Sequence, residues 1–145
     1  MRILIRLFFR TLRPFLTPIV LLVDRVAAPT PVKRPEPEQE YVDRQTRALT
    51  LYQFKTCPFC IKTRHAIRRL ALNIELRNAQ HDPVSRDELL TGGGEIKVPC
   101  LRIVQEDGSV RWMYESSDII DYLEGRFGSE VDFTDTQPGF SNQPD

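Results

Sequence analysis

The spacing of apolar residues in the middle of the chain predicts seven elements of secondary structure. Short apolar runs between turn signals predict strands, and apolar residues that recur every three or four positions predict helices. The expected order is a strand at 48–54, a helix at 58–72, a strand at 73–78, a helix at 83–90, strands at 98–104 and 110–114, and a helix at 116–127. A βαβ unit followed by a hairpin and a helix makes one mixed four-stranded sheet with helices on both faces. The order βαβαββα therefore predicts an α/β fold.

The helix expected at 58–72 has an apolar face and a basic face. Pro58 takes the first helical position, where its missing N–H costs nothing. The apolar face consists of Ala66, Ile67, Leu70 and Ala71. We expect the cations of this helix to face solvent, and there is no acid among them: Lys62, Arg64, Arg68 and Arg69.

A mostly apolar stretch at residues 3–23 precedes this region, and arginines interrupt it. Its longest run without a charge is residues 14–23, which is shorter than the ~20 apolar residues of a membrane-spanning helix. The arginines are four, four and three residues apart and so share one helical face: Arg2, Arg6, Arg10 and Arg13. Such a basic amphipathic helix favours an anionic membrane surface. Residues 1–26 are therefore predicted to be a membrane-associating helix.

Two other interpretations of this stretch stay open. A signal peptide would have its basic region at 1–13, its apolar region at 14–23 and a cleavage site at 26–28. A signal anchor would use arginines that snorkel to the membrane interface. A surface-bound segment leaves the following domain in the cytoplasm, where thiols are kept reduced. A cleaved or spanning segment places that domain in the periplasm or elsewhere outside the cytoplasm.

Composition divides the remaining residues into three parts. Residues 27–47 contain four prolines and several acids, and Pro-rich charged segments stay extended and bury little. We expect a linker there, followed by a globular domain at 48–127. Residues 128–145 contain four acids and no Lys or Arg, which predicts a disordered acidic tail.

The charges of these parts cancel. The 145 residues include 20 basic and 20 acidic side chains, and this balance argues against a nucleic-acid partner. However, residues 1–34 hold seven cations and one anion, a net charge of +6, so the rest of the neutral chain carries −6. The basic part supports a membrane surface as its partner. Three cysteines are too few for a disulfide-stapled secreted domain.

Two of the cysteines stand where the first predicted strand gives way to a helix. In Cys57-Pro58-Phe59-Cys60 the first thiol precedes the helix and the second lies one turn inside it. The free N–H groups and partial positive charge of the helix start stabilise a thiolate, and Lys55 adds positive charge. The two-residue gap allows a disulfide between the two sulfurs. We therefore expect Cys57 to be the nucleophile and Cys60 the resolving thiol.

A metal site is the alternative for this pair. One C-x-x-C supplies only two of the four ligands that structural zinc needs, and no fixed spacing ties it to Cys100, His65 or His81. A C-x-x-C at a helix start favours redox chemistry, so no metal is expected. We expect Cys100 to be a small buried strand residue, with a third reactive thiol as the alternative.

Two further motifs lie at expected element boundaries. A proline at the start of a central strand, as in Val98-Pro99, removes a ladder donor, and a cis X-Pro bond is one reason for it. The Val98 backbone would then face the Cys57 turn and pair with a peptide-like thiol substrate. Glu115-Ser116 is either an ordinary N-cap or a carboxylate-binding helix start, with Glu115 available for an ammonium group.

Three stretches in this order resemble glutaredoxins, and more closely the glutathione-transferase-like branch: residues 51–60, 97–101 and 114–123. The first stretch is also similar to the thioredoxin-like domain of type 2 prostaglandin E synthases. The resemblance covers residues 48–127 and implies a thioredoxin-like fold with glutathione as cosubstrate. It implies glutathione contacts from Val98 beside cis-Pro99, from Glu115 and Ser116 to the γ-glutamyl group, and from Lys55 and Phe59.

There are departures from the glutaredoxin pattern. Phe54 stands where many glutaredoxins have a basic residue, and Phe59 replaces a commoner tyrosine. The resemblance implies a glutathione-dependent thiol–disulfide oxidoreductase that reduces protein disulfides or glutathionylated proteins at or near a membrane. The alternative is a non-enzymatic iron–sulfur cluster carrier or redox sensor that uses Cys57 and glutathione.

Overall fold

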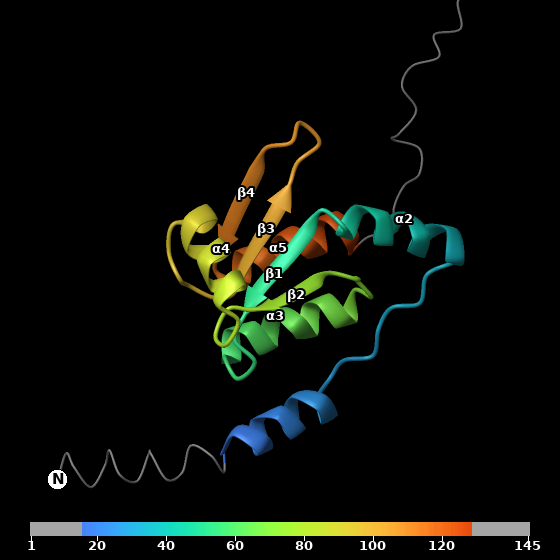
Figure 1. Cartoon of the computed structure of the whole chain (residues 1–145). Helices are drawn as coiled ribbons and strands as arrows, with labels where there is room; N and C mark the ends of the chain where they lie inside the picture. Colours follow the sequence, from blue (N-terminus) through green and yellow to red (C-terminus); the bar gives the residue numbers. More distant parts are fainter. Residues whose placement is uncertain (1–15, 129–145) are drawn as a thin grey trace, which may run out of the picture.

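The computed structural model describes residues 16–128 and shows a sheet flanked by helices (Figure 1). Residues 16–26 form a first helix. The elements that follow are α2 (Glu36–Thr46), β1 (Leu49–Gln53), α3 (Pro58–Arg69), β2 (Glu75–Asn78), α4 (Pro83–Gly93), β3 (Cys100–Val104), β4 (Val110–Tyr114) and α5 (Ser116–Phe127). From β1 to α5 this confirms the predicted order. The predicted tail from residue 129 and the first 15 residues of the predicted membrane segment lie outside the described part.

The four strands form one mixed sheet in the order β2-β1-β3-β4. β1 is parallel to β2 and antiparallel to β3, and β3 is antiparallel to β4. All residues of the central strand β1 are buried, whereas Glu75 and Leu76 of the edge strand β2 are exposed. The mixed four-stranded sheet is thus the predicted one.

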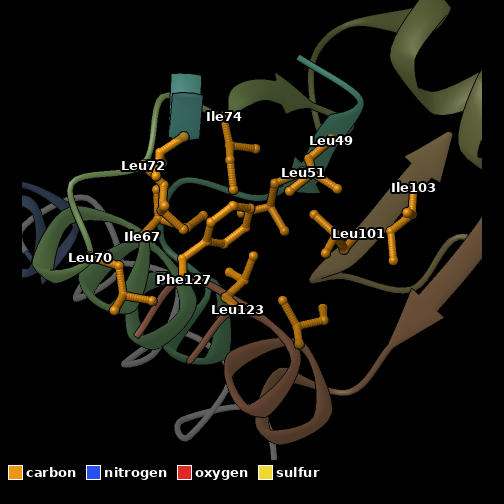
Figure 2. Close-up of a cluster of buried hydrophobic side chains, with 12 residues drawn as sticks. Leu49, Leu51, Ile67, Leu70, Leu72, Ile74, Leu101, Ile103, Leu123 and Phe127 are labelled. Carbon is orange, nitrogen blue, oxygen red and sulfur yellow. The ribbon is translucent and has the colours of Figure 1, made fainter. Parts of the chain in front are cut away.

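The sheet has a hydrophobic core on each face, because successive residues of a strand point to opposite sides. Leu49 and Leu51 of β1 point into the main core, which side chains of α3 and α5 complete (Figure 2). Tyr52 points to the other face and packs with Leu89 of α4. Helices therefore cover both faces, as predicted: α3 and α5 on one, α4 on the other.

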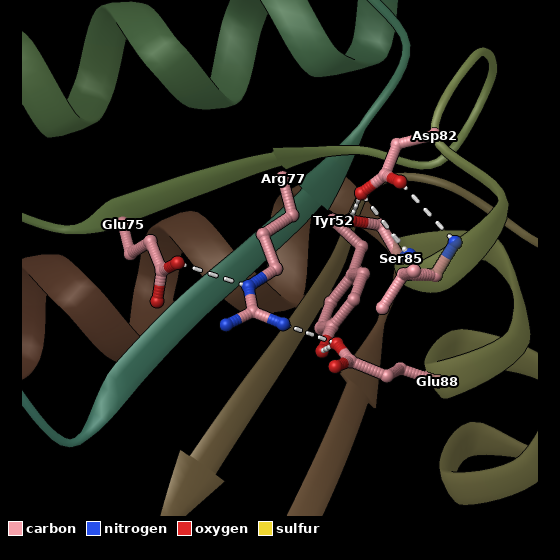
Figure 3. A network of polar contacts seen from close by, with 7 residues as sticks. Tyr52, Glu75, Arg77, Asp82, Ser85 and Glu88 are labelled. Carbon is pink, nitrogen blue, oxygen red and sulfur yellow. Dashed lines mark hydrogen bonds and ion pairs between the residues drawn. The ribbon is translucent and has the colours of Figure 1, made fainter.

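A network of polar contacts holds α4 against the sheet (Figure 3). The Tyr52 hydroxyl donates to the Glu88 carboxylate at 2.8 Å, and Arg77 of β2 pairs with the same carboxylate. Burial, together with Glu88, raises the pKa of Tyr52 to about 12. Asp82 caps α4 by accepting hydrogen bonds from two backbone N–H groups of its first turn. The position of α4 is thus fixed by its own cap and by contacts with β1 and β2.

The prediction of an extended linker at 27–47 is wrong for most of its second half. Glu36–Thr46 form α2, and Val42 of this helix is fully buried in the main core. The first turn of α2 contains a proline and two glutamates. A proline needs no N–H partner there, and the acids meet the positive end of the helix dipole. The residues that suggested an extended spacer therefore start a helix.

Arg34 connects this segment to the ends of two other helices. Its guanidinium donates to the carbonyl of Leu70, just after α3, and at 2.8 Å to the carbonyl of Phe127, which ends α5. Gln39 of α2 donates to the carbonyl of Ala71 at 2.9 Å. The last carbonyls of a helix lack partners within it and carry partial negative charge. A cation there stabilises both helix ends at once.

The helix at residues 16–26 is the described part of the predicted membrane-associating segment. It exposes several large apolar side chains: Leu16, Ile19, Leu21, Leu22, Val23 and Val26. Between residues 16 and 128, no helix combines the length and the apolar character that crossing a membrane requires. Binding of this segment to a membrane surface stays a prediction.

Two helical glycines are expected to respond in opposite ways to alanine. A Cβ on Gly92 of α4 would lie 2.2 Å from Cζ2 of the Trp112 ring, so Gly92→Ala should lower the free energy of unfolding by about 1–3 kcal/mol. A Cβ on Gly125 of α5 would meet nothing within 4 Å, so Gly125→Ala should raise it by about 0.5–1 kcal/mol. Urea unfolding measures both. Equal signs would contradict the close approach of α4 to β4.

Candidate functional site

The register of the strands brings the three predicted motifs to one end of the sheet. Tyr52 of β1 lies opposite Cys100 of β3, and Cys100 lies opposite Tyr114 of β4. Because β3 is antiparallel to both neighbours, its first residue stands beside the last residues of β1 and β4. The turn after β1, the residues before β3 and the start of α5 therefore lie at the same end.

Two cysteines stand at the start of α3, one helical turn apart. Cys57 is the N-cap residue, and Pro58 begins the helix. Cys57 is half-buried and Cys60 is fully buried, and both thiols are free. Burial raises the pKa of Cys60 to about 12, and the neighbouring Cys57 adds to this effect, so Cys60 stays protonated at neutral pH. Cys57 is therefore the more accessible of the two, and its role as the nucleophile stays a prediction.

The Val98–Pro99 peptide bond is cis, as predicted. Pro99 is buried, and Val98 packs against the same buried cluster as Phe54, which follows β1. The carbonyl of Phe54 accepts a hydrogen bond from the backbone N–H of Cys57 at 3.3 Å. The cis bond and the dithiol turn are thus connected through Phe54. Pairing of the Val98 backbone with a substrate stays a prediction.

The start of α5 is not an ordinary N-cap. Glu115 takes the N-cap position with a φ of 68°, and no side chain caps this helix end. A left-handed backbone is uncommon for a residue other than glycine and marks local strain. The start of α3 also lacks a side-chain cap, whereas Asp82 caps α4. The two helix starts at this end of the sheet therefore have N–H groups without a capping side chain, and those beside Ser116 are suited to an anion.

Glu115 has a cationic partner that the sequence did not indicate. Its carboxylate pairs with the ammonium group of Lys97, which immediately precedes Val98. The hydrogen bond and the charge of Glu115 raise the pKa of Lys97. Glu115 thus holds an ammonium group here, the type of ligand predicted for it. In the sequence, only the position of Lys97, two residues before Pro99, indicated that it would lie near the site.

Among the cations near the dithiol, Arg64 differs from the prediction. Lys55 is exposed, as is Phe59 at 62%. The side chain of Arg64 is only 15% exposed, so the prediction that it faces solvent is wrong. Its guanidinium finds acceptors inside the fold, in the Gln53 side chain at 2.6 Å and the Lys55 carbonyl at 3.1 Å. Its spacing of four residues from Cys60 was a usable signal, because such residues share a helix face.

The third thiol, Cys100, is fully buried in β3, which confirms the prediction of a small buried strand residue. Burial raises its pKa to about 11. Within residues 16–128, no three or more His, Cys, Asp or Glu side chains are grouped so that they could hold a metal ion.

Sequence comparison identifies relatives of this region. A 76-residue stretch is 40% identical to prostaglandin E synthase 2 of Mus musculus, and covers 52% of this chain and 19% of that protein. The chain thus matches about a fifth of the length of this relative.

Two solved structures of a maleylacetoacetate isomerase from Anaeromyxobacter dehalogenans are also similar. One is 22% identical with a TM-score of 0.41 and covers 56% of this chain and 36% of the isomerase. The other, with bound dicarboxyethyl glutathione and citrate, is 23% identical with a TM-score of 0.43. It covers 56% of this chain and 37% of the isomerase.

Residues 51–131 match the family described as glutathione S-transferase, N-terminal domain, which is more than half of the 145 residues. The match begins in β1, includes the dithiol, the cis-proline and the start of α5, and extends past the end of α5. It confirms the resemblance to the glutathione-transferase-like branch of the glutaredoxins. The chain therefore belongs to the family of the glutathione S-transferase N-terminal domain.

Proposed function

We propose that this protein is a glutathione-dependent thiol–disulfide oxidoreductase of the glutaredoxin type. Its substrates are protein disulfides and protein–glutathione mixed disulfides. The observation that carries the proposal is the pair of free thiols one helical turn apart at the start of α3, one accessible and one buried. Membership of a glutathione S-transferase family supports glutathione as the cosubstrate.

Glutathione would bind across the end of the sheet at which the motifs meet. Its γ-glutamyl carboxylate would take the N–H groups beside Ser116, and its ammonium group would displace Lys97 from Glu115. Its peptide groups would pair with the backbone of Val98, beside cis-Pro99. Lys55 is available for the glycine carboxylate, and the exposed ring of Phe59 covers the rim.

The reaction begins with the thiolate of Cys57. It attacks the glutathione sulfur of a mixed disulfide, the old S–S bond breaks, and the substrate thiolate leaves and takes up a proton. The thiolate of a second glutathione then attacks the sulfur of the glutathione that is now bound to Cys57. This step releases glutathione disulfide and restores the Cys57 thiolate. Alternatively, Cys60 loses its proton and attacks Cys57, which releases glutathione and leaves a Cys57–Cys60 disulfide for two further glutathione molecules. Because the pKa of Cys60 is about 12, we expect the first route to dominate.

The proposed place of action is a membrane surface on its cytoplasmic side. The basic and apolar composition of residues 1–26 supports this location, because it suits anionic lipid. The exposed apolar side chains of residues 16–26 supply part of the contact. Binding of the full chain to anionic and to neutral vesicles would separate the charge contribution from the apolar one.

The function is tested by the rate at which the purified full chain reduces a glutathionylated peptide in the presence of glutathione. We expect saturable turnover far above that of glutathione alone, and its loss after the protein is alkylated with iodoacetamide, because the accessible thiol is Cys57. Turnover that survives alkylation would contradict the proposal. Visible absorbance after anaerobic purification, without turnover, would instead favour the iron–sulfur carrier.

A further inference from the structure

Arg64 connects the helix of the dithiol to the turn that carries Cys57. It lies four residues after Cys60, on the same face of α3. Its guanidinium donates to the Gln53 side chain at 2.6 Å and to the Lys55 carbonyl at 3.1 Å. These acceptors are the last residue of β1 and a residue of the turn itself. A planar fork with fixed donors is suited to hold such a turn in one geometry.

A third partner reaches Arg64 from outside the predicted globular domain. The carboxylate of Asp24, in the helix at residues 16–26, accepts a hydrogen bond from Arg64 at 2.8 Å and contacts His65 at 2.7 Å. Asp24 and Arg64 are 17% and 15% exposed, so the pair is largely shielded from solvent. Burial raises the pKa of Asp24, but the hydrogen bonds and charges of Arg64 and then His65 outweigh this and lower it. Asp24 is therefore ionised at neutral pH, opposite the Arg64 cation.

The charge of Arg64 acts on Cys60, the buried thiol of the pair. Burial is the main influence on Cys60 and raises its pKa, whereas the positive charge of Arg64 opposes this rise. A cation that stabilises a thiolate is weakened when a carboxylate binds to it, because the two charges largely cancel at a distance. The ion pair with Asp24 therefore makes the positive charge near the thiols depend on the position of the helix at residues 16–26.

We propose that Arg64 is a positioning residue of the redox centre, and that Asp24 controls how much of the Arg64 charge acts on Cys57 and Cys60. The inference rests on the proposed function, because only a reactive dithiol gives this control a purpose. It also connects the proposed membrane binding of the N-terminal segment with the proposed redox chemistry of the dithiol. When the helix at residues 16–26 leaves α3, for example to enter a membrane surface, Arg64 loses its counter-ion and the thiols become more reactive.

The proposal predicts changes of opposite sign in two variants. Asp24→Asn removes the counter-ion and should raise the rate of Cys57 alkylation at pH 7 by roughly three- to tenfold. Arg64→Gln removes the cation and its hydrogen bond to the turn, and should lower this rate by a similar factor. In the Arg64→Gln background, Asp24→Asn should have almost no further effect, since the two residues act through one contact.

The experiment uses the full chain and measures alkylation of the reduced protein by iodoacetamide, followed site by site with mass spectrometry. Equilibration with dithiothreitol gives the reduction potential of the dithiol, which should rise in Asp24→Asn and fall in Arg64→Gln. The controls are Glu40→Gln, an exposed acid of α2, and Arg68→Gln, an exposed cation of α3. Both controls should leave the rate and the potential unchanged.

The pH dependence separates this charge effect from a loosened fold. The rate ratio between Asp24→Asn and the wild type should fall towards one as the pH is raised, because the thiolate fraction then limits the rate in neither protein. A loosened fold would keep the ratio high and would also expose Cys60 to alkylation. Changes of equal sign in the two single variants, or additive effects in the double variant, would overturn the proposal. Neither measurement needs glutathione, so a protein without glutathione-dependent activity would still test the Asp24–Arg64 coupling.

Discussion

Cys57→Ser is expected to lower the rate of mixed-disulfide reduction by about a thousandfold or more. A serine hydroxyl remains un-ionised at neutral pH and forms no disulfide, so the first covalent step is lost. Removing a catalytic nucleophile commonly costs this much or more. The fold should be unaffected, because Cys57 is half-buried at a helix start and serine is a favoured N-cap residue. Steady-state turnover of a glutathionylated peptide by the full chain measures the loss.

The other two cysteines provide matched controls. Cys60→Ser should keep most of the mixed-disulfide activity, because glutathione resolves the intermediate without it. Cys100→Ala should keep the activity as well, because Cys100 is fully buried in β3. If Cys60→Ser abolished turnover while Cys57→Ser kept it, the order of attack derived from burial would be wrong.

The double variant Arg34→Ala/Val42→Ala is expected to lower the free energy of unfolding by roughly 4 kcal/mol. Val42 is fully buried in the main core, so its truncation loses apolar burial and leaves a cavity. Arg34 gives up its bonds to the carbonyls at the ends of α3 and α5. This loss is a large fraction of the ~5–15 kcal/mol that stabilises a typical domain. Urea unfolding followed by circular dichroism measures it.

The matched control for this pair is Lys33→Ala/Glu40→Ala, which changes two exposed neighbours. Each of these substitutions should alter the free energy of unfolding by less than about 0.5 kcal/mol. If residues 27–47 were an extended spacer, both double variants would be equally harmless. A large difference between them would show that this segment is part of the folded unit.

The parts of the site that the sequence predicted are those with a local physical cause. The Cys57–Cys60 turn follows from a strand end, a proline at the first helical position and a spacing of one helical turn. The cis bond at Pro99 could be predicted because a proline at the start of a central strand needs a special backbone. The order of strands and helices followed from periodicity, and the boundary of α3 differed by three residues, at Arg69 rather than at residue 72.

The parts that the sequence did not predict depend on partners far along the chain. Prolines and acids at residues 35–38 suggested an extended spacer, although the same residues are favourable in the first turn of a helix. Of the two buried residues of α2, Val42 and Thr46, only Val42 is apolar and belongs to the core. A single apolar position produces no helical periodicity that could be recognised in the sequence. The burial of Arg64 depends on Asp24, 40 residues earlier, and no local pattern indicates that pair.

Trp112 is an intrinsic fluorescent probe of this fold, because it is the only tryptophan of the chain. Its ring lies 5.5 Å from the ring of Tyr52, beneath the guanidinium of Arg102 and against Gly92 of α4. All of these contacts belong to the face of the sheet that α4 covers, opposite the main core. Tryptophan emission therefore reports the docking of α4, whereas far-UV circular dichroism averages over every helix. If α4 undocks from the sheet first during unfolding, the change in tryptophan emission would precede the change in circular dichroism.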